Sequence, residues 1–228
     1  MKVFKYTNKG SRERNQDYIT HSDIGECASL YVLADGMGGY ESGEIAAQLV
    51  AEAVIEFVQT HADHIAPDSI LPEAFLYADA VLSAKRAEME VEKTGAVIVA
   101  AYILSDRVEV AWLGDSRFYL IRDGKEVYVT SDHSLVNDLK SAGTYKEGDS
   151  ERYASFVTRC IMGDGNSGET GTASLSLQGG DLLVLCSDGI HKEMDIPMLP
   201  SSDDILQNQL DALAPTMPDN LSIIRILV

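Results

Sequence analysis

Four strand-like segments follow one another almost without interruption in the middle of the chain, at 96–104, 107–113, 117–122 and 125–129. The pairs Ser105-Asp106 and Asp123-Gly124 have the composition and spacing of hairpin turns. Strands joined by such short turns lie antiparallel, because a parallel pair needs a much longer crossover. This part of the chain therefore predicts a meander of antiparallel strands.

Two long helices precede the meander. From Glu41 to about Thr60, apolar residues recur every four positions, and a second helix is predicted from near Asp68 to Lys93. Further strands are predicted at 2–6, 17–21, 28–34, 172–177, 181–187 and 221–227, and short helices at 133–142 and 203–213. Two adjacent helices among antiparallel strands indicate an α+β layered sandwich rather than a doubly wound fold.

The composition narrows what such a sandwich could bind. The 228 residues suit one well-buried domain over 1–228, and no apolar segment approaches the roughly 18 residues that would span a membrane. The formal net charge of −18 disfavours nucleic acid and anionic membranes as partners.

The N-terminus lacks the apolar segment of a secretory signal. Three scattered cysteines, Cys27, Cys160 and Cys186, predict a cytoplasmic protein without disulfides.

Three apolar segments end in an aspartate beside a glycine. They are VLADG at 32–36, AWLGDS at 111–116 and LLVLCSDG at 182–189. Strands that end this way can bring Asp35, Asp115 and Asp188 to one edge of the sandwich, and Asp219 lies just before the final strand. Each aspartate alone is more typical of an ordinary turn. The four together indicate a shared site.

Clustered carboxylates need a compensating charge, because like charges that share a site resist ionisation. Divalent cations supply that charge. Oxygen ligands without His or Cys at ligand spacing favour Mg²⁺ or Mn²⁺ over zinc.

A second charged motif, SRERNQD at 11–17, lies directly before the predicted strand at 17–21. The guanidinium of Arg12 is suited to bidentate binding of a phosphate. A solvated turn with incidental charge is the alternative interpretation.

Taken together, these motifs resemble the metal-dependent protein phosphatases, the protein phosphatase 2C or PPM family, in a compact bacterial form. The resemblance extends from about residue 8 to the C-terminus. It is carried by the ordered motifs RERNQD at 12–17, ADGMGG at 34–39 with Gly43-Glu44, GDSR at 114–117, SDHS at 131–134, CSDG at 186–189 and Asp219-Asn220. The resemblance implies two antiparallel sheets flanked by helices, in a four-layer α/β/β/α sandwich.

The resemblance also implies a centre with two Mn²⁺ or Mg²⁺ ions that hydrolyses phosphoserine and phosphothreonine. The bridging carboxylate would be Asp35, the carbonyl ligand Gly36, and the remaining carboxylates Asp188 and Asp219. A third, weaker metal site would use Asp115 together with Asp188.

Three further positions carry expected roles in the reaction. Arg12 matches the phosphate-binding arginine, and Asp17 would orient the attacking water. Gln16 stands where relatives have an acidic residue and can still hold a water. Met37 occupies the place where some relatives have a histidine that serves as general acid, so the proton donor for the leaving alcohol stays open. The stretch that begins at Lys93-Thr94-Gly95 also departs from the family pattern.

The polar segment 142–153 matches the family's variable flap, and it is either a solvated loop or a substrate-selecting flap. The expected partners are phosphorylated proteins, a Ser/Thr kinase and its targets, and the protein is expected to be a monomer. Two other functions stay open at this point: a phosphatase for small phosphorylated metabolites, and a catalytically weak binding module of the same fold. The four retained aspartates disfavour the binding module.

Overall fold

The computed structural model describes residues 1–37 and 42–228, in which the meander between 96 and 129 is divided between two sheets. Its two hairpins form as predicted, and Asp123 and Gly124 both have the positive φ of a tight hairpin turn. The first hairpin belongs to one sheet and the second to the other. The link between them, 114–116, therefore crosses from sheet to sheet, and it carries Asp115.

All strand pairs in both sheets are antiparallel. One sheet contains, in spatial order, β1 (Lys2–Asn8), β10 (Leu221–Leu227), β9 (Leu182–Cys186), β6 (Arg117–Arg122) and β7 (Lys125–Val129). The other contains β2 (Asp17–Ile24), β3 (Ala28–Gly36), β4 (Ala96–Ile103), β5 (Arg107–Leu113) and β8 (Gly171–Ser176). The two sheets face each other across a shared apolar core.

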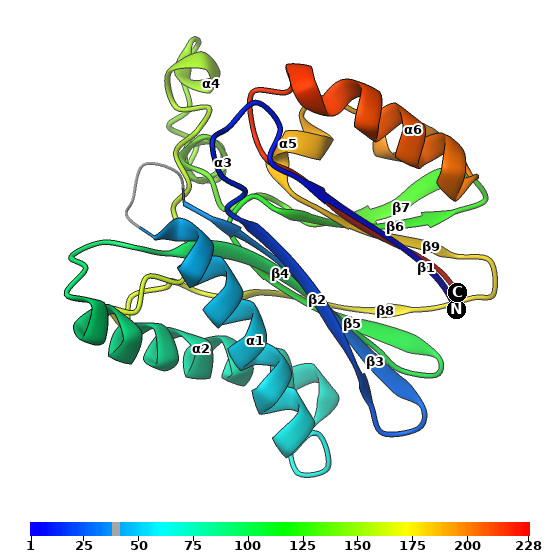
Figure 1. The fold of residues 1–228 in the computed structure, drawn as a ribbon, viewed down its shortest axis with the longest axis horizontal. Coiled ribbons are helices and arrows are strands. Elements are labelled where there is room, and N and C mark those ends of the chain that lie inside the picture. Colours follow the sequence, from blue (N-terminus) through cyan, green and yellow to red (C-terminus); the bar gives the residue numbers. More distant parts are fainter. Residues whose placement is uncertain (38–41) are drawn as a thin grey trace.

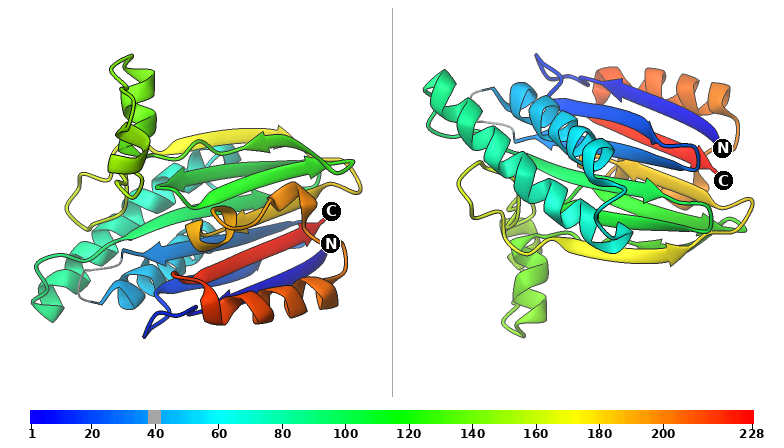
Figure 2. Two further views of the ribbon diagram at one scale, coloured as in Figure 1. Left: turned by 90° about the horizontal axis from the view of Figure 1, so that it is seen from above. Right: turned by 90° about the horizontal axis from the view of Figure 1, so that it is seen from below.

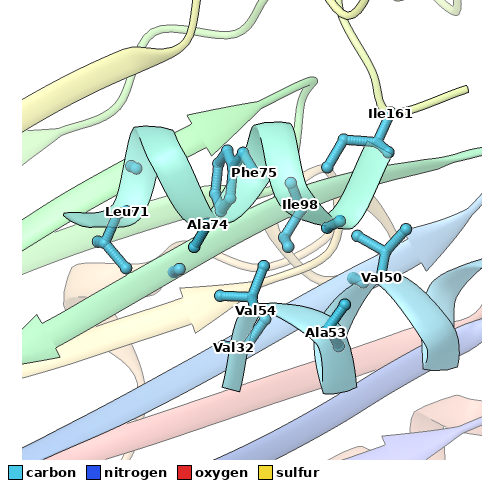
Figure 3. Packing of buried hydrophobic residues seen from close by; sticks show 14 of the residues in the cluster. Val32, Val50, Ala53, Val54, Leu71, Ala74, Phe75, Ile98 and Ile161 are labelled. Carbon is cyan, nitrogen blue, oxygen red and sulfur yellow. The ribbon is translucent and has the colours of Figure 1, made fainter. Parts of the chain in front are cut away.

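Helices cover the outer face of each sheet, which gives the four-layer α/β/β/α sandwich (Figure 1). The helices α1 (Gly43–His61) and α2 (Pro67–Met89) pack on the β2–β8 sheet. Figure 3 shows Val54 and Phe75 of these helices packed against Val32 of β3 and Ile98 of β4. The short helix α5 (Asp188–His191) and α6 (Asp203–Leu213) cover the outer face of the other sheet. The predicted fold class is confirmed.

The alternation of side chains along the strands decides which residues reach the space between the sheets. In β3, Val32 faces the helices whereas Tyr31 and Leu33 face the opposite sheet. Asp35 comes two positions after Leu33, so its side chain points the same way, toward the opposite sheet, at the end of the strand. The inter-sheet core is apolar along most of its length and ends at this carboxylate.

Most predicted boundaries agree with the structure within a few residues, and the differences have local causes. The second helix ends at Met89 rather than Lys93, because Glu90 adopts a left-handed conformation and closes the helix. The predicted helix at 133–142 is α3 (Leu135–Ser141). Four single-turn elements were not predicted: α4 (Asp149–Arg152), α5, η1 (Ile196–Met198) and η2 (Ala214–Thr216). Gly38, Gly39 and Glu41, which belong to predicted features, lie outside the described residues.

The segment that holds α3 and α4 projects from the sandwich (Figure 2). It includes the predicted flap at 142–153. None of the helices in the described part of the chain has the length and the apolar run needed to cross a membrane.

Candidate metal centre

Two of the predicted site residues lie opposite each other on neighbouring strands. Asp17 begins β2 and Asp35 lies near the end of β3, and the two are register partners in the antiparallel pair. The side chains of both residues point into the space between the sheets, so their carboxylates share that space. Asp17 is 7% exposed. The Ser187 hydroxyl, at the end of β9 in the opposite sheet, donates a hydrogen bond of 2.9 Å to Asp17 Oδ2.

Asp115 is placed by the link that crosses between the sheets. Gly114 has φ 112° and packs against Val97, a position that a larger residue could not occupy. His133 holds this turn from both sides, since its backbone N–H donates to the Gly114 carbonyl and its Nδ1 accepts from the Gly114 N–H. The Nε2 of His191 donates to the Asp115 carbonyl at 2.9 Å. The backbone that presents Asp115 is thus fixed by two histidines.

The GDSR and SDHS motifs meet through an ion pair. Arg117 and Asp132 form two parallel hydrogen bonds, Nε to Oδ1 at 2.7 Å and Nη2 to Oδ2 at 2.8 Å. Ser134 of the second motif caps α3 by accepting from the Asn137 N–H. Arg117, Asp132 and Ser134 thus stabilise the loops beside the site rather than lining it.

The other sheet contributes Asp188 and Asp219. Asp188 is the first residue of α5, two residues after the end of β9, and Asp219 lies two residues before β10. The neighbouring Asn220 ties this end of the sheet to the segment that follows β1. Its Oδ1 accepts from the Gln16 N–H, and its Nδ2 donates to the carbonyls of Lys9 and Arg14.

These strand ends lie at the end of the sandwich opposite the two termini (Figure 1). They surround one pocket of about 250 Å³. Seven of the eight predicted site residues line it: Arg12, Gln16, Asp35, Gly36, Asp115, Asp188 and Asp219. Asp17 is not among these lining residues; it is buried, and its carboxylate lies beside that of Asp35. Met37, Lys192 and Asn220 also line the pocket, as do Ser155 and Val157 from the segment that follows α4.

Gly36 allows the chain to approach α1 very closely. A Cβ at this position would lie 2.3 Å from the Gly43 carbonyl oxygen, so no larger residue fits without a backbone shift. The Gly36 N–H donates to the Gln16 carbonyl, and the next N–H, of Met37, donates to Gly95. The unusual Thr94-Gly95 stretch therefore supports the turn that follows Asp35.

The carboxylates around the pocket oppose one another's ionisation. The pKa of Asp35 is raised well above its ordinary value, first by desolvation and then by the negative charge of its neighbours. Those neighbours are Asp17, Asp188, Asp115 and Asp219. Desolvation also raises the pKa of Asp17, and desolvation together with the charge of Asp188 raises the pKa of Asp115 to about 6. A set of acids this crowded calls for added positive charge.

The donor set fits hard divalent cations. All of its side-chain donors are oxygens, and the buried Oδ1 of Asp17 has no hydrogen-bond partner. In residues 1–37 and 42–228, no three Asp, Glu, His or Cys side chains already meet as a ligand set would. Two of the carboxylates are turned to side-chain cations, Asp188 to Lys192 at 2.6 Å and Asp219 to Arg12 at 3.0 Å.

Arg12 lies on the pocket rim, bound to the segment before β10. Its Nε donates to the Pro218 carbonyl at 2.8 Å and its Nη2 to Asp219. A guanidinium has five N–H groups, so donors remain for a further ligand. The Gln16 amide lies against Gly43 at the start of α1.

Sequence reasoning assigned no role to Ser187, His191 or Lys192. Ser187 joins the two sheets, since its hydroxyl donates to Asp17 and accepts from the Ser222 N–H. Lys192 follows Asp188 by four residues, and that helical spacing between opposite charges was the available signal.

Comparison with known proteins gives a consistent result. The sequence model of the Protein phosphatase 2C family matches residues 7–222. A putative protein phosphatase 2C-type protein of Streptococcus pyogenes is 32% identical over 196 residues, which are 83% of this chain and 79% of the relative. The serine/threonine protein phosphatase PstP of Mycobacterium tuberculosis is 34% identical over 170 residues, which are 72% of this chain and 32% of that longer protein.

Solved structures share the whole architecture. A bacterial serine phosphatase superposes with a TM-score of 0.86 at 25% identity, covering 100% of this chain and 98% of the other. The catalytic domain of the phosphatase PstP, in complex with two manganese ions, superposes with a TM-score of 0.77 at 25% identity, covering 98% and 96%.

Proposed function

Because the chain belongs to the protein phosphatase 2C family, we propose that the pocket between the sheet ends is its metal centre and that Asp35, Gly36, Asp188 and Asp219 hold the ions. The protein is a metal-dependent serine/threonine protein phosphatase that uses two Mn²⁺ or Mg²⁺ ions and acts on phosphoproteins.

The observation that supports this site most strongly is the position of Asp35. It lines the pocket, and its pKa is raised first by burial and then by the repulsion of four other carboxylates. Only added positive charge relieves that repulsion while all the groups are ionised. We expect Asp35 to bridge the ions, because it has all the other acids as neighbours.

Two ions held here would polarise the phosphate ester and make water a stronger nucleophile. Asp17 has an unpartnered Oδ1 that can accept a hydrogen bond from the attacking water, while Ser187 fixes its other oxygen. The remaining N–H groups of Arg12 can bind the phosphate oxygens. Gln16 offers a neutral amide beside the same water. No histidine is among the described residues that line the pocket, so the proton for the leaving alcohol has another source, such as solvent.

The test is hydrolysis of a phosphothreonine peptide by the purified protein with Mn²⁺, with EDTA, and in the variant Asp35→Asn. We expect activity that requires both the metal and Asp35. The matched control is Asp63→Asn, which alters an exposed carboxylate just after α1. A folded Asp35→Asn protein with full Mn²⁺-dependent activity would overturn the proposed site.

The pocket is bordered by Ser155 and Val157, which directly follow the segment 142–153. We propose that this segment is a flap that contacts the protein around the phosphorylated residue. Deletion of 144–151 is expected to reduce turnover of a phosphoprotein more than turnover of a small aryl phosphate. Equal losses on both substrates would contradict this role.

The remaining assignments are also proposals. We propose a single domain over 1–228, because β1 pairs with β10 along its whole length. A cytoplasmic location is supported by free Cys27, Cys160 and Cys186. The proposed partners are a Ser/Thr kinase and its phosphorylated targets, with the phosphatase itself a monomer. Sedimentation of the protein and dephosphorylation of a co-expressed kinase would test these points.

A further inference from the structure

Lys192 is the one lysine among the described residues that line the pocket. It follows the single-turn helix α5, and its N–H donates to the Asp188 carbonyl at 3.0 Å. This turn of helix brings its side chain back over the residue four positions earlier. The Nζ lies 2.6 Å from Asp188 Oδ2.

The same ammonium group also faces Asp115, at 3.9 Å from Oδ2. Lys192 therefore lies between carboxylates from two different elements, the link after β5 and the start of α5. The Asp115 and Asp188 side chains are only 14% and 17% exposed. The Asp115 backbone is held by His191, which directly precedes Lys192 in the chain.

This arrangement supplies one positive charge where two carboxylates converge. A lysine ammonium group this close to two carboxylates is stabilised in its charged form by their attraction. A divalent ion between the same two carboxylates would have to displace this group or bind beside it. Binding beside it is opposed by repulsion between like charges at short range.

We propose that the Lys192 ammonium group occupies the place between Asp115 and Asp188, so that the centre takes two divalent ions and no third. This inference rests on the metal centre proposed above. It departs from the expectation of a third, weaker ion at Asp115 and Asp188. Asp188 would keep one carboxylate oxygen for the two-ion centre and direct the other to Lys192.

The test is the stoichiometry of Mn²⁺ binding, measured by equilibrium dialysis with the free ion read by its electron paramagnetic resonance signal. Wild-type protein is expected to bind two ions. Lys192→Met, which keeps the length of the side chain without its charge, is expected to bind a third ion about tenfold or more tightly than wild type does. Lys192→Arg keeps the charge and is expected to bind two.

Two further variants locate the effect. Lys192→Met combined with Asp115→Asn is expected to return to two ions, because one of the two freed carboxylates is gone. Lys85→Met removes a lysine on α2 that pairs with Glu88 outside the pocket, and two ions are expected to remain.

Two results would overturn this inference alone. One is a third ion in wild-type protein that Asp115→Asn removes, which means that Lys192 moves aside. The other is a Lys192→Met protein that still binds only two ions. A wild-type protein that binds no Mn²⁺ would overturn the proposed metal centre together with this inference, so the failures are distinguishable.

Discussion

Replacing Asp115 by asparagine is expected to stabilise the metal-free protein at about pH 8. The variant removes a carboxylate whose pKa is raised to about 6 by desolvation and by the charge of Asp188, against the opposing attraction of Lys192. An acid whose pKa is higher in the folded state favours folding when protonated. That contribution is complete below the unfolded value of 3.8 and is lost as the pH rises through about 6.

The magnitude follows from these two values. A pKa difference of 1 corresponds to about 1.4 kcal/mol, so the difference between 3.8 and about 6 amounts to about 3 kcal/mol once Asp115 is ionised in both states. The side chain is 14% exposed, so solvent screens it little. The value of about 6 already includes the attraction to Lys192. Asparagine is also a buried polar group and keeps part of the desolvation cost, which lowers the expected gain to about 1–3 kcal/mol.

The assay is urea denaturation in EDTA at about pH 8 and about pH 5, with Asp63→Asn as the control. The gain in the free energy of unfolding is expected to fall by about 1.4 kcal/mol at the lower pH, since the carboxylate is then largely protonated in the folded state. The control is expected to change stability by less than about 0.5 kcal/mol at both values, because its carboxylate is exposed. A variant that is no more stable than wild type at pH 8, or equally stabilised at both, would refute the reasoning.

Three further changes test the site. Arg12→Ala is expected to lower kcat/KM for a phosphopeptide about 100-fold while Mn²⁺ affinity stays largely intact, because its spare N–H groups are proposed to bind the phosphate and a guanidinium cannot be a metal ligand. Ser187→Ala leaves a buried Asp17 oxygen unpaired and is expected to cost about 1–3 kcal/mol in urea denaturation, with reduced turnover. Gly36→Ala is expected to cost at least about 2 kcal/mol in the same assay, since its Cβ would meet the Gly43 carbonyl oxygen at 2.3 Å.

Each of these predictions has an opposing result. Equal losses of Mn²⁺ affinity and catalysis in Arg12→Ala would assign the arginine to the metal centre through its bond to Asp219. Wild-type stability in Ser187→Ala would show that another donor, such as water, satisfies Asp17. A fully stable Gly36→Ala protein would show that the start of α1 shifts at little cost.

The sequence predicted the strands well because their apolar cores and hairpin turns are local signals. The segments at 107–113, 117–122 and 125–129 have the observed boundaries. The division of the meander between two sheets was not predictable in this way. A turn specifies that the two strands it joins are paired, but it does not specify which other strand pairs with the free edge of that hairpin. Single-turn helices such as α5 were missed, since four residues hold no periodic pattern.

The candidate site was predictable as a list of acids but not as an arrangement. Aspartates near strand ends suggested Asp35, Asp115, Asp188 and Asp219. Arg12 was singled out by its guanidinium, and the family motifs supplied the roles of Gly36, Gln16 and Asp17. The hydrogen bond between Ser187 and Asp17 joins residues that are 170 positions apart, and no local pattern indicates it. Lys192 was visible as a charge but could be linked to Asp115 only through the fold.

The pairing of β1 with β10 has a consequence for the time at which the enzyme becomes active. The strand at Lys2–Asn8 has its partner at Leu221–Leu227, so during synthesis it stays unpaired until that later strand has left the ribosome. Arg12 follows β1, Asp219 precedes β10, and the two meet only when this pair closes. Such long-range contacts form late and slowly. A nascent chain therefore has no working centre until β10 has been made, and phosphatase activity reports that the whole sandwich has closed.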